Sequence, residues 1–577
     1  MTDIISNNQV KHGESHVKAL AAAIEGSVVN AAWQTEDQVC IEVPKDKLPE
    51  CVEFMYYKRG GWLPDMVCAD ERSINGYYWL YYLLSMEEED PCFVTIATKI
   101  SPQSMEFPSV SSRVPAVIWS EREAFDMMGL RAVGLTDARR LVLPDDWPDD
   151  LHPLQKDAMD YRHRPARARE VENYEFLNES GVEDPTVVPM GPLHITSDEP
   201  GHFRLFCEGE TIVDADYRLF YVHRGMEKVA ESRMVYDSIP FLADRICGIC
   251  GFAHSVAYVQ SVENAIGIEV PKRAECMRAI CLEVERLHSN MLNLGLVCHY
   301  CGFDTGFMHF FRVREKAMNL AALLTGHRKT YGLNLIGGVR RDMLAEQTNA
   351  TLSMIKELRV DMNNLVAMLL ETKNFESRTS GIGNLDRQIC RDYSPVGPMV
   401  RGSGYARDAR FDHPYAGYKY LSGFSANVAD SCDVAGRTLV RIHDCLDALD
   451  MIEQLIELAP TGPILNEDYK YVPGKFALGW TEAPRGEDMH WSKSGNNQKI
   501  YRWRAKAATY SNWPVLRYAL QGNTVSDAAV IVGSLDPCYS CTDRVTICDI
   551  KTHKETIISK QQLEDYAANR THSPLKG

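Results

Sequence analysis

The chain has 577 residues, more than one hydrophobic core usually organises, so two or three folding units are expected. Apolar residues make up 45% of it and charged residues 24%, which is typical of a globular protein in water. The net charge of -17 argues against a nucleic-acid-binding protein, because such proteins present a basic stripe to phosphates, and no nucleic-acid partner is expected.

Short β-rich runs open the chain. Residues 38–43 (QVCIEV) and 92–97 (CFVTIA) predict strands that are separated by polar turns. These runs indicate a compact α+β domain over residues 1–165. A charged segment that contains a proline and four arginines follows at residues 160–172 (DYRHRPARAREVE), and a linker is predicted over residues 166–185.

A second, mainly helical domain is predicted over residues 186–544. Residues 202–209 (HFRLFCEG) and 210–220 (ETIVDADYRLF) indicate strands near its start. Pro271 suits the first position of a helix. Apolar residues then recur at three- to four-residue spacing, at Ile280, Val284, Leu287 and Met291. Further long helical patterns cover residues 310–325, 343–371 and 426–458.

Four long helices without a short repeat predict a helical bundle. The predicted fold class is therefore α+β. It consists of an N-terminal α+β domain fused to a mainly helical domain that is built on a long-helix bundle with small peripheral sheets.

Seventeen cysteines in a chain without an apparent secretory signal do not suggest a disulfide framework, and most are expected to be reduced core residues. Two Cys-x-x-Cys pairs stand apart, Cys247/Cys250 and Cys538/Cys541. Four thiolates form a soft site that suits nickel, zinc, copper or an iron-sulfur centre. Structural zinc is the simpler alternative, but zinc ribbons usually take their pairs from neighbouring segments, and these pairs lie at opposite ends of a domain.

Two further features bear on the cysteines. His254 lies four residues after Cys250, so on a helix it would share a face with that sulfur and could donate an N–H to it. A third pair, Cys298 and Cys301, falls late in the first bundle helix, and we expect both to be core thiols.

Both outer motifs resemble those of a known family. Arg-Ile-Cys-Gly-Ile-Cys-x-x-x-His at residues 245–254 and Asp-Pro-Cys-x-x-Cys at 536–541 are similar to the paired signatures of nickel-iron hydrogenase large subunits. Each occurs once, in the family's order, on either side of the predicted bundle. Further stretches, such as 191–205 (GPLHITSDEPGHFRL) and 482–491 (EAPRGEDMHW), resemble the formate hydrogenlyase and hydrogenase-4 type, an energy-converting branch related to respiratory complex I. The resemblance covers nearly the whole chain.

The resemblance implies a nickel-iron catalytic centre whose iron carries cyanide and carbon monoxide ligands. Cys247 and Cys538 would bind nickel terminally, and Cys250 and Cys541 would bridge nickel to iron. The implied enzyme is a hydrogenase that reversibly interconverts protons plus electrons and dihydrogen. Heterolytic dihydrogen chemistry needs an electrophilic metal pair and a nearby base, and the thiolate of Cys538 is expected to be that base.

The same resemblance assigns roles to residues around the centre. Glu199 matches the family's proton-gating glutamate, although a proline here separates it from the following glycine. Arg485 resembles the arginine above the open metal position, and Asp536 is expected to fix it through hydrogen bonds. His254 and Pro484 are expected to line the cofactor. The simpler alternatives are an exposed loop carboxylate for Glu199 and a local ion pair for Arg485.

Three positions depart from the family pattern. Ser289 stands where many uptake hydrogenases carry a second carboxylate near the arginine. Glu227 matches a ligand of an accessory magnesium or iron ion, but Arg544 replaces its histidine partner. A cation beside an arginine is unfavourable, so an ion pair between Glu227 and Arg544 is the alternative. Residues 545–577 resemble the extension that is removed on maturation.

No iron-sulfur motif is recognised in this chain, so electrons must come from partners. The resemblance implies an iron-sulfur small hydrogenase subunit, ferredoxin-like electron-transfer subunits, formate dehydrogenase and integral membrane subunits, with a maturation endopeptidase and nickel-insertion proteins acting earlier. Residues 1–165 resemble the small hydrophilic quinone-module subunit of complex I and are expected to be a docking domain. No apolar run reaches the roughly 18 to 20 residues that span a bilayer, and no signal-peptide core is present. A cytoplasmic location, on the inner face of the membrane through partners, is therefore expected.

Two other functions are compatible with parts of the sequence. A complex I-like quinone-module scaffold would share the fold, but such subunits have lost the four cysteines that this chain keeps. A zinc-stabilised assembly subunit would contain zinc alone. Nickel and iron together, with infrared bands of cyanide and carbon monoxide, would distinguish the hydrogenase from both.

Overall fold

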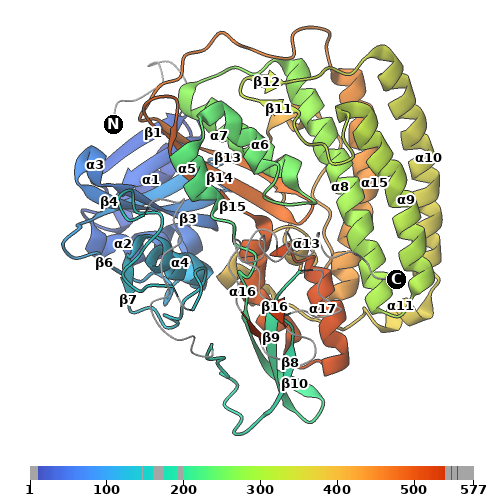
Figure 1. The fold of residues 1–577 in the computed structure, drawn as a ribbon, viewed down its shortest axis with the longest axis horizontal. Coiled ribbons are helices and arrows are strands. Elements are labelled where there is room, and N and C mark those ends of the chain that lie inside the picture. The colour runs from blue at the N-terminus through green and yellow to red at the C-terminus, as the bar shows by residue number, and fades with distance from the viewer. Residues whose placement is uncertain are drawn as a thin grey trace, which may run out of the picture.

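The computed structural model describes residues 11–145, 147–159, 174–192 and 199–539, together with two short strand segments, β16 (Ile547–Cys548) and β17 (Glu555–Thr556). Figure 1 shows sheets on one side of the molecule and long helices on the other. Within the described part of the chain, we find no helix that has both the length and the apolar character needed to cross a membrane.

The N-terminal part forms a five-stranded sheet in the order β1-β2-β5-β4-β3, in which only β2 and β5 are parallel. The strands are β1 (Asn30–Thr35), β2 (Gln38–Glu42), β3 (Trp62–Glu71), β4 (Tyr77–Met86) and β5 (Cys92–Ile100). The strands predicted at 38–43 and 92–97 are confirmed as β2 and β5. Strand β3 is buried at every position, because its sheet also contacts the second sheet of the chain.

The second sheet is an antiparallel meander of β13 (Phe476–Ala483), β14 (Gly486–Ser494) and β15 (Ile500–Lys506). Gln38 of the first sheet exchanges hydrogen bonds with the backbone of Leu478 in β13, at 2.9 and 3.3 Å. Helix α7 (Gly251–Ile266) packs on the meander so closely that a Cβ at Gly479 would lie 2.0 Å from the carbonyl oxygen of Ala257. This sheet is therefore held between the N-terminal sheet and the helices.

Four long helices run side by side at the other end of the molecule (Figure 1). They are α8 (Lys272–Tyr300), α9 (Asp304–Thr325), α10 (Ala345–Leu370) and α15 (Val434–Leu458). The predicted bundle is confirmed. Helix α15 begins eight residues later than predicted, because Cys432 adopts a φ of +61° and the Asp433 carboxylate caps the helix by accepting from the Gly436 N–H at 2.9 Å.

A third, three-stranded sheet and two short helices complete the part of the fold that positions the site. The sheet contains β8 (Thr186–Met190), β9 (His202–Glu208) and β10 (Thr211–Arg218), and the helices are α16 (Ala508–Leu520) and α17 (Ala528–Leu535). The strands predicted near residues 202–220 are confirmed as β9 and β10. Helix α17 lies against α8, and the chain that leaves it leads directly to Cys538.

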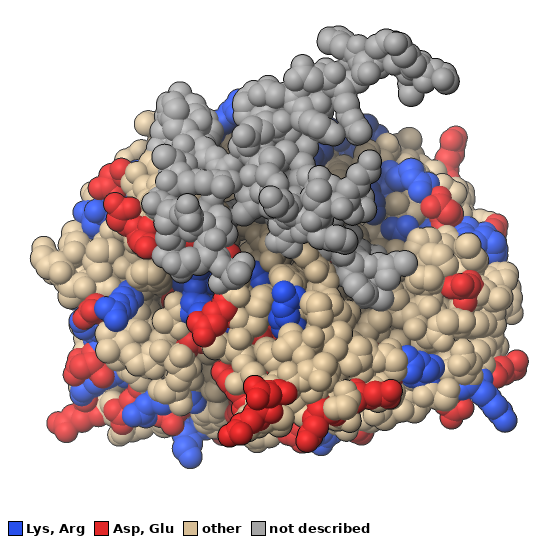
Figure 2. All heavy atoms as spheres, turned by 60° about the horizontal axis from the view of Figure 1, so that its bottom comes forward, with Lys and Arg blue, Asp and Glu red and all other residues tan. Residues whose placement is uncertain are grey.

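Acidic and basic side chains are interspersed over the described part of the face in Figure 2. No disulfide joins the described cysteines, and Cys298 and Cys301 are buried core residues as predicted. Most of the described cysteines are therefore packing residues of the core.

Candidate metal centre

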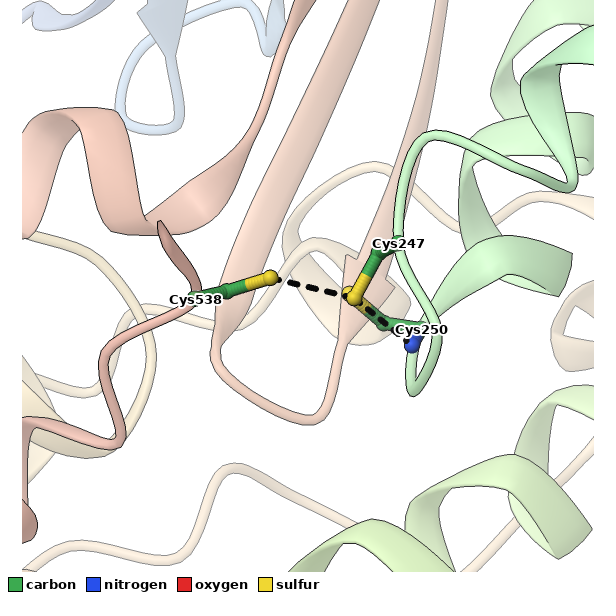
Figure 3. Close-up of side chains that lie close together, drawn as sticks. All are labelled: Cys247, Cys250 and Cys538. Carbon is green, nitrogen blue, oxygen red and sulfur yellow. Dashed lines mark hydrogen bonds between the residues drawn. The ribbon is translucent and has the colours of Figure 1, made fainter. Parts of the chain in front are cut away.

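Three cysteine sulfurs from two distant segments meet in the interior. The Sγ atoms of Cys247 and Cys538, 291 residues apart in sequence, lie 3.1 Å from each other. Together with the Sγ of Cys250 they lie within 4.8 Å of one another, and all three residues are buried (Figure 3). A disulfide needs about 2.05 Å between its sulfurs, so these are neighbouring thiols. Cys541, the fourth predicted ligand, lies outside the described residues.

The loop that carries Cys247 and Cys250 joins α6 (Ile239–Ala243) to α7. The backbone N–H groups of Ile249 and Cys250 point at the Cys247 sulfur, at 3.2 and 3.3 Å. Gly251 begins α7 where a Cβ would lie 2.0 Å from the carbonyl oxygen of Asp244, so only glycine fits. The loop is thereby folded back on itself with both sulfurs on one side (Figure 3).

Helix α8 fixes both sulfur-bearing segments. Glu285 accepts hydrogen bonds from the first free N–H groups of α7, those of Phe252 and Ala253, each at 2.9 Å. Asn293, two turns further along α8, donates to the carbonyl of Gly533 at 2.8 Å and so anchors the end of α17. One helix thus sets the separation between the two halves of the thiol cluster.

The donor set fits a soft metal centre. Thiolate sulfur is the ligand type that nickel, iron and zinc take in buried sites. The neighbouring thiols Cys247 and Cys538, together with burial, raise the pKa of Cys250 well above its ordinary value. Three crowded thiols therefore resist ionisation in the absence of a metal. A bound cation would offset the repulsion between the three thiolates, so that all of them could be ionised together.

Close to the thiols lies a group that we call the canopy, formed by Arg485, Asp536, Arg441 and Ser289. Arg485 donates to the carboxylate of Asp536 at 2.8 Å and to its carbonyl at 2.9 Å. Its remaining nitrogen, Nη1, donates to the Ser289 hydroxyl at 3.0 Å. Arg441 pairs with the other carboxylate oxygen of Asp536 at 3.2 Å. Two guanidinium groups thus share one carboxylate, which leaves a buried excess of positive charge beside the sulfurs.

The turn between β13 and β14 is held through its backbone. The four carbonyl groups of residues 482–485 each accept a hydrogen bond from a buried side chain. Arg286 donates to the first two at 2.7 and 3.4 Å, Arg441 to that of Pro484 at 3.3 Å, and Asn512 to the fourth at 3.3 Å. Because each carbonyl is held, the backbone from which Arg485 projects is fixed.

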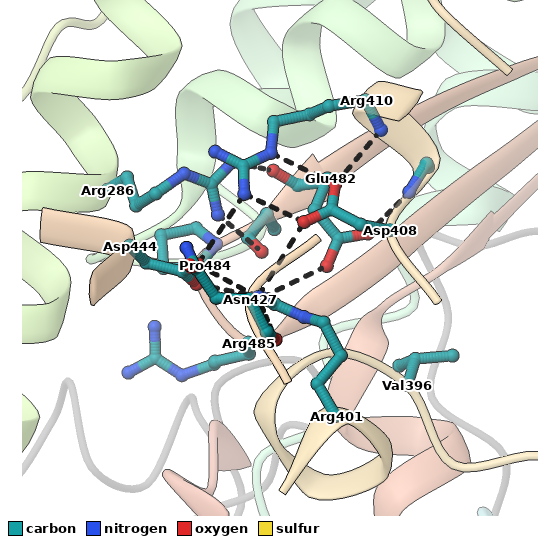
Figure 4. Close-up of polar contacts among 12 residues, drawn as sticks. Arg286, Val396, Arg401, Asp408, Arg410, Asn427, Asp444, Glu482, Pro484 and Arg485 are labelled. Atoms are coloured by element: carbon teal, nitrogen blue, oxygen red, sulfur yellow. Dashed lines mark hydrogen bonds and ion pairs between the residues drawn. The ribbon is translucent and has the colours of Figure 1, made fainter. Parts of the chain in front are cut away.

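Figure 4 shows that this turn is part of a larger buried network of charged side chains. Arg401 and Asp444 form a bidentate pair at 2.8 and 2.7 Å, and Arg410 forms another with Asp408 at 2.9 and 2.7 Å. Fork-to-fork pairs of this kind restrict geometry as well as neutralise charge. The network therefore links the bundle helix α15 rigidly to the turn.

His254 lies on the first turns of α7, next to Cys250. One of its ring nitrogens, the sulfur of Cys250 and a carboxylate oxygen of Asp488 all lie within 4.8 Å of one another. Its Nδ1 is 3.1 Å from Nε2 of His490, and no described residue hydrogen-bonds its Nε2. The imidazole is therefore in reach of the thiol cluster, on the side where sequence analysis expected it.

Comparisons with known proteins agree with this geometry. A family described as nickel-dependent hydrogenase matches residues 224–304, which include the first cysteine pair. The chain is 57% identical to formate hydrogenlyase subunit 5 of Escherichia coli (strain K12), over 99% of this chain and 100% of that one. It is also 57% identical to hydrogenase-4 component G of the same organism, with the same coverage. The chain belongs to the nickel-iron hydrogenase large subunits of the formate hydrogenlyase and hydrogenase-4 type.

As a member of this family, the chain is a hydrogenase catalytic subunit with a nickel-iron active site. It is also related to respiratory complex I. The 49 Kd subunit family of respiratory-chain NADH dehydrogenase matches residues 301–477 and 471–544, and the 30 Kd subunit family matches 41–163. A solved structure of the membrane-bound sulfane sulfur reductase, an archaeal respiratory membrane complex, contains a chain with a TM-score of 0.59 and 29% identity, covering 63% of this hydrogenase and 99% of that chain.

The predicted glutamates occupy different places. Glu199 lies two residues before Gly201. A Cβ on Gly201 would lie 2.5 Å from the ring of Tyr539, so the chain that follows Glu199 passes close to the residue after Cys538. Glu227, on α5 (Met226–Arg233), accepts a hydrogen bond from Arg502 at 2.6 Å and lies 3.7 Å from a nitrogen of Arg504. An accessory cation at Glu227 would face both guanidinium groups.

Several predictions fall on residues outside the described part of the chain. They are Cys541, Arg544, residues 166–173 of the linker and the extension at 545–577 apart from its two strand segments. The ion pair between Glu227 and Arg544 therefore stays a prediction, as do the domain boundaries.

Sequence reasoning missed the residues that hold the canopy and the His254 ring. Arg286, Arg441, Asn512 and His490 were not singled out. The available signal was a charged side chain at an inward position of a helix, because Arg286 and Arg441 fall on the buried faces of α8 and α15, and a buried arginine requires partners.

Proposed function

We propose that this hydrogenase evolves dihydrogen, reversibly in principle, with electrons that originate from formate oxidation. Its four cysteines, Cys247, Cys250, Cys538 and Cys541, are proposed to hold the nickel-iron centre, whose iron carries cyanide and carbon monoxide. The observation that carries the proposal is the convergence of three buried sulfurs from segments 291 residues apart. A zinc ribbon would draw its pairs from neighbouring segments.

The proposed roles divide between metal ligands and proton groups. When bound, the centre supplies an electrophilic metal pair and exchanges electrons. Cys247 and Cys538 would hold the nickel, and Cys250 and Cys541 would hold the nickel and the iron together. The Cys538 sulfur accepts or delivers the proton of the reaction, and Glu199 passes it toward solvent. The approach of Gly201 to Tyr539 supports a short path between these two groups.

Arg485 is proposed to stabilise charge that develops at the open metal position. Its guanidinium is buried, so each hydrogen bond that it donates acts without competition from water. In this chain a neutral hydroxyl, Ser289, takes the position of a second carboxylate, and the canopy therefore keeps its positive excess. A cationic canopy favours anionic character at the metal centre and anchors Asp536 beside it.

The partners proposed are those implied by the family. Electrons would arrive through an iron-sulfur small subunit and ferredoxin-like subunits from formate dehydrogenase, and integral membrane subunits would hold the assembly at the inner face of the membrane. Maturation would need nickel-insertion proteins and an endopeptidase that removes residues 545–577. Residues 1–165 would form the domain that docks these partners. Residues 166–185 would link this domain to the catalytic domain of residues 186–544. The name formate hydrogenlyase subunit 5, borne by a relative that matches end to end, supports this assignment.

Two alternatives remain distinguishable by chemistry. A quinone-module scaffold is favoured by the complex I family matches, but it has no use for a buried thiol cluster. A zinc-stabilised assembly subunit would use the thiols without nickel. Neither alternative accounts for a buried arginine canopy close to the sulfurs.

The deciding experiment replaces Cys541 with alanine and purifies the complex. Loss of nickel together with loss of hydrogen evolution is expected, because one of four thiolate ligands is removed. The matched control is Cys301→Ala, which removes a buried thiol from the third Cys-x-x-Cys pair and should keep both. Hydrogen evolution that survives Cys541→Ala, or a wild-type complex with zinc and no cyanide or carbon monoxide infrared bands, would refute the proposal.

A further inference from the structure

Two arginines of β15 are buried where the N-terminal sheet meets the meander of β13, β14 and β15. Arg502 and Arg504 are separated by one residue, so both side chains leave the same face of the strand. That face is directed at β3, where Arg502 donates to the carbonyl of Cys68 at 2.8 Å. A guanidinium stays charged at any physiological pH, so each of these two needs a counter-charge in the interior.

Helix α5 supplies the first two counter-charges. Glu227 and Glu231 are four residues apart and therefore share a face of that helix. Both accept from Nη1 of Arg502, at 2.6 and 3.0 Å. The other oxygen of Glu227 accepts from the backbone N–H of Ala505 at 3.2 Å. The other oxygen of Glu231 accepts from Nζ of Lys156 at 2.5 Å. Both carboxylates of α5 are thus fully occupied by N–H donors.

The N-terminal part of the chain supplies the other two counter-charges. Asp65 of β3 accepts from Arg504 with both oxygens, at 2.7 and 3.1 Å, in a bidentate pair. Glu123 of α4 (Ile118–Met128) accepts from the remaining nitrogen of Arg504, and its other oxygen accepts from the Tyr510 hydroxyl at 2.7 Å. The same nitrogen of Arg504 lies 3.7 Å from Glu227. One guanidinium therefore joins carboxylates from both parts of the chain.

This cluster bears on the accessory ion, because Glu227 is the residue that matches a ligand of the family's magnesium or iron ion. A magnesium ion takes about six oxygen ligands in an octahedron. Every carboxylate oxygen of the four acidic residues already accepts from an N–H or O–H donor. Among the described residues, no three ligand atoms that lie within 4.8 Å of one another include any of these carboxylates. The residues present therefore do not fit the ion.

We propose that the guanidinium groups of Arg502 and Arg504 take the place of the accessory cation. Two carboxylates of the N-terminal part, Asp65 and Glu123, complete this site as counter-charges. The N-terminal part therefore belongs to the buried charge balance of the catalytic subunit, in addition to any docking role. The proposal does not depend on the direction of catalysis or on the source of electrons. Removal of one guanidinium should leave buried carboxylates that a divalent cation can bind.

Manganese(II) is the probe, because it binds carboxylates as magnesium does and is detected by electron paramagnetic resonance. The purified wild-type complex and its Glu227→Gln variant should retain equal amounts of manganese per nickel, since Glu227 holds no ion. Arg504→Gln leaves Asp65 and Glu123 without their guanidinium partner. This variant should unfold at a lower temperature than wild type. Excess manganese(II) should restore part of the difference, and the variant should retain additional manganese per nickel.

Arg278→Gln is the matched control. Arg278 is equally buried but pairs with the single carboxylate of Glu263, so manganese(II) should not restore its unfolding temperature. If Arg504→Gln does not assemble, Glu123→Gln replaces it, because this side chain is 13% exposed and its loss is milder. Glu123→Gln should unfold at a lower temperature than wild type, with or without manganese(II).

Three results would overturn the inference. The first is manganese that wild type retains and Glu227→Gln loses, because an ion would then bind at Glu227. The second is an unfolding temperature of Arg504→Gln, or of Glu123→Gln, that equals that of wild type. The third is an Arg504→Gln complex whose loss manganese(II) does not reduce, or reduces no more than in Arg278→Gln.

Discussion

Arg485 binds Asp536 at two points, donating to its carboxylate at 2.8 Å and to its backbone carbonyl at 2.9 Å. Asp536 adopts a left-handed φ of +60° at the end of α17 and lies two residues before Cys538. The backbone contact therefore fixes the course of the chain into a metal-binding cysteine, while the carboxylate contact fixes the guanidinium. One arginine couples the shape of the metal site to the charge above it.

Arg485→Lys should lower the turnover number for hydrogen evolution. An ammonium is a single point of charge and cannot reproduce the three contacts of the planar guanidinium. Removing a preorganised donor from a buried site costs about 10²–10³-fold in kcat. Nickel and iron contents should remain at the wild-type level, because no sulfur ligand changes. Hydrogen evolution per nickel, measured with a reduced viologen dye, checks this expectation.

Arg278→Lys is the control for that experiment. Arg278 is equally buried and forms a bidentate pair with Glu263 at 2.9 and 2.7 Å, outside the metal site. The Arg278→Lys variant should lose thermal stability but keep its hydrogen evolution per nickel. Equal activity losses in the two variants would show that Arg485 acts through folding alone.

Gly486→Ala should damage both stability and activity. Gly486 has a φ of +128°, and a Cβ there would lie 2.6 Å from the backbone nitrogen of Gly397 and 2.6 Å from a methyl carbon of Val396. The turn would have to move away, and it carries Arg485 with it. Overpacking of this kind costs about 1–3 kcal/mol, in addition to the cost of the unfavourable φ.

Gly474→Ala is the control that separates the cost of overpacking from the cost of the unfavourable φ. Gly474 precedes β13 with a φ of +80°, but a Cβ there meets no described atom within 4 Å. It should lose only about 1–2 kcal/mol, from backbone strain, and keep its activity per nickel. Free energies of unfolding from denaturant titrations, compared with activity per nickel, test the pair. Full activity in Gly486→Ala would mean that the turn does not position Arg485.

The helical part of the fold could be predicted because its signal is local. Ile280, Val284, Leu287 and Met291 repeat at helical spacing, and each has 0% exposure in α8. The start of α15 was misplaced because residues before Asp433 continue the apolar pattern, while the left-handed Cys432 and the cap at Asp433 are settled by backbone geometry. Periodicity finds the body of a helix better than its end.

The thiol cluster could be anticipated, but its surroundings could not. The spacing of the cysteines indicates candidate metal ligands, and the resemblance to a known family indicates that the two pairs bind one centre. The partners of the canopy are joined across long separations, since Arg441 meets Asp536 and Arg401 meets Asp444 only after α15 has packed. His254 meets His490 of β14, which in turn accepts a hydrogen bond from Trp503 of β15. No pattern along the sequence carries that information.

Asp444→Leu should destabilise the chain by about 3–5 kcal/mol. It removes the bidentate partner of Arg401, whose guanidinium is fully buried and would then depend on more distant carboxylates. Burial of an unpaired charge is the physical cause. The double variant Arg401→Met with Asp444→Leu should recover part of the loss, with a coupling energy of about 0.5–3 kcal/mol. Additive losses in a double-mutant cycle of unfolding free energies would contradict a direct interaction.

His413 should make the protein less stable as the pH falls. Its ring is buried, with Nε2 at 2.8 Å from the Ser85 hydroxyl and its centroid 4.3 Å from that of Phe93. Burial lowers the pKa of His413 to about 3, against 6.5 for the free side chain. Between these values the unfolded chain binds a proton that the folded chain does not. The contribution of the neutral His413 ring to the free energy of unfolding is therefore complete above about pH 6.5. Below that pH it decreases by up to about 1.4 kcal/mol per pH unit.

His413→Gln isolates that contribution, because a glutamine can still hydrogen-bond Ser85 but does not titrate. Unfolding free energies of wild type and variant, measured by denaturant titration between about pH 4 and 8, should run parallel above pH 6.5 and converge below it. The comparison is with His309→Gln, which changes a histidine that is exposed in the folded chain and should stay parallel to wild type throughout. If the His413→Gln curve also stays parallel to wild type at acidic pH, the buried ring is protonated in the folded state, and burial does not set its charge.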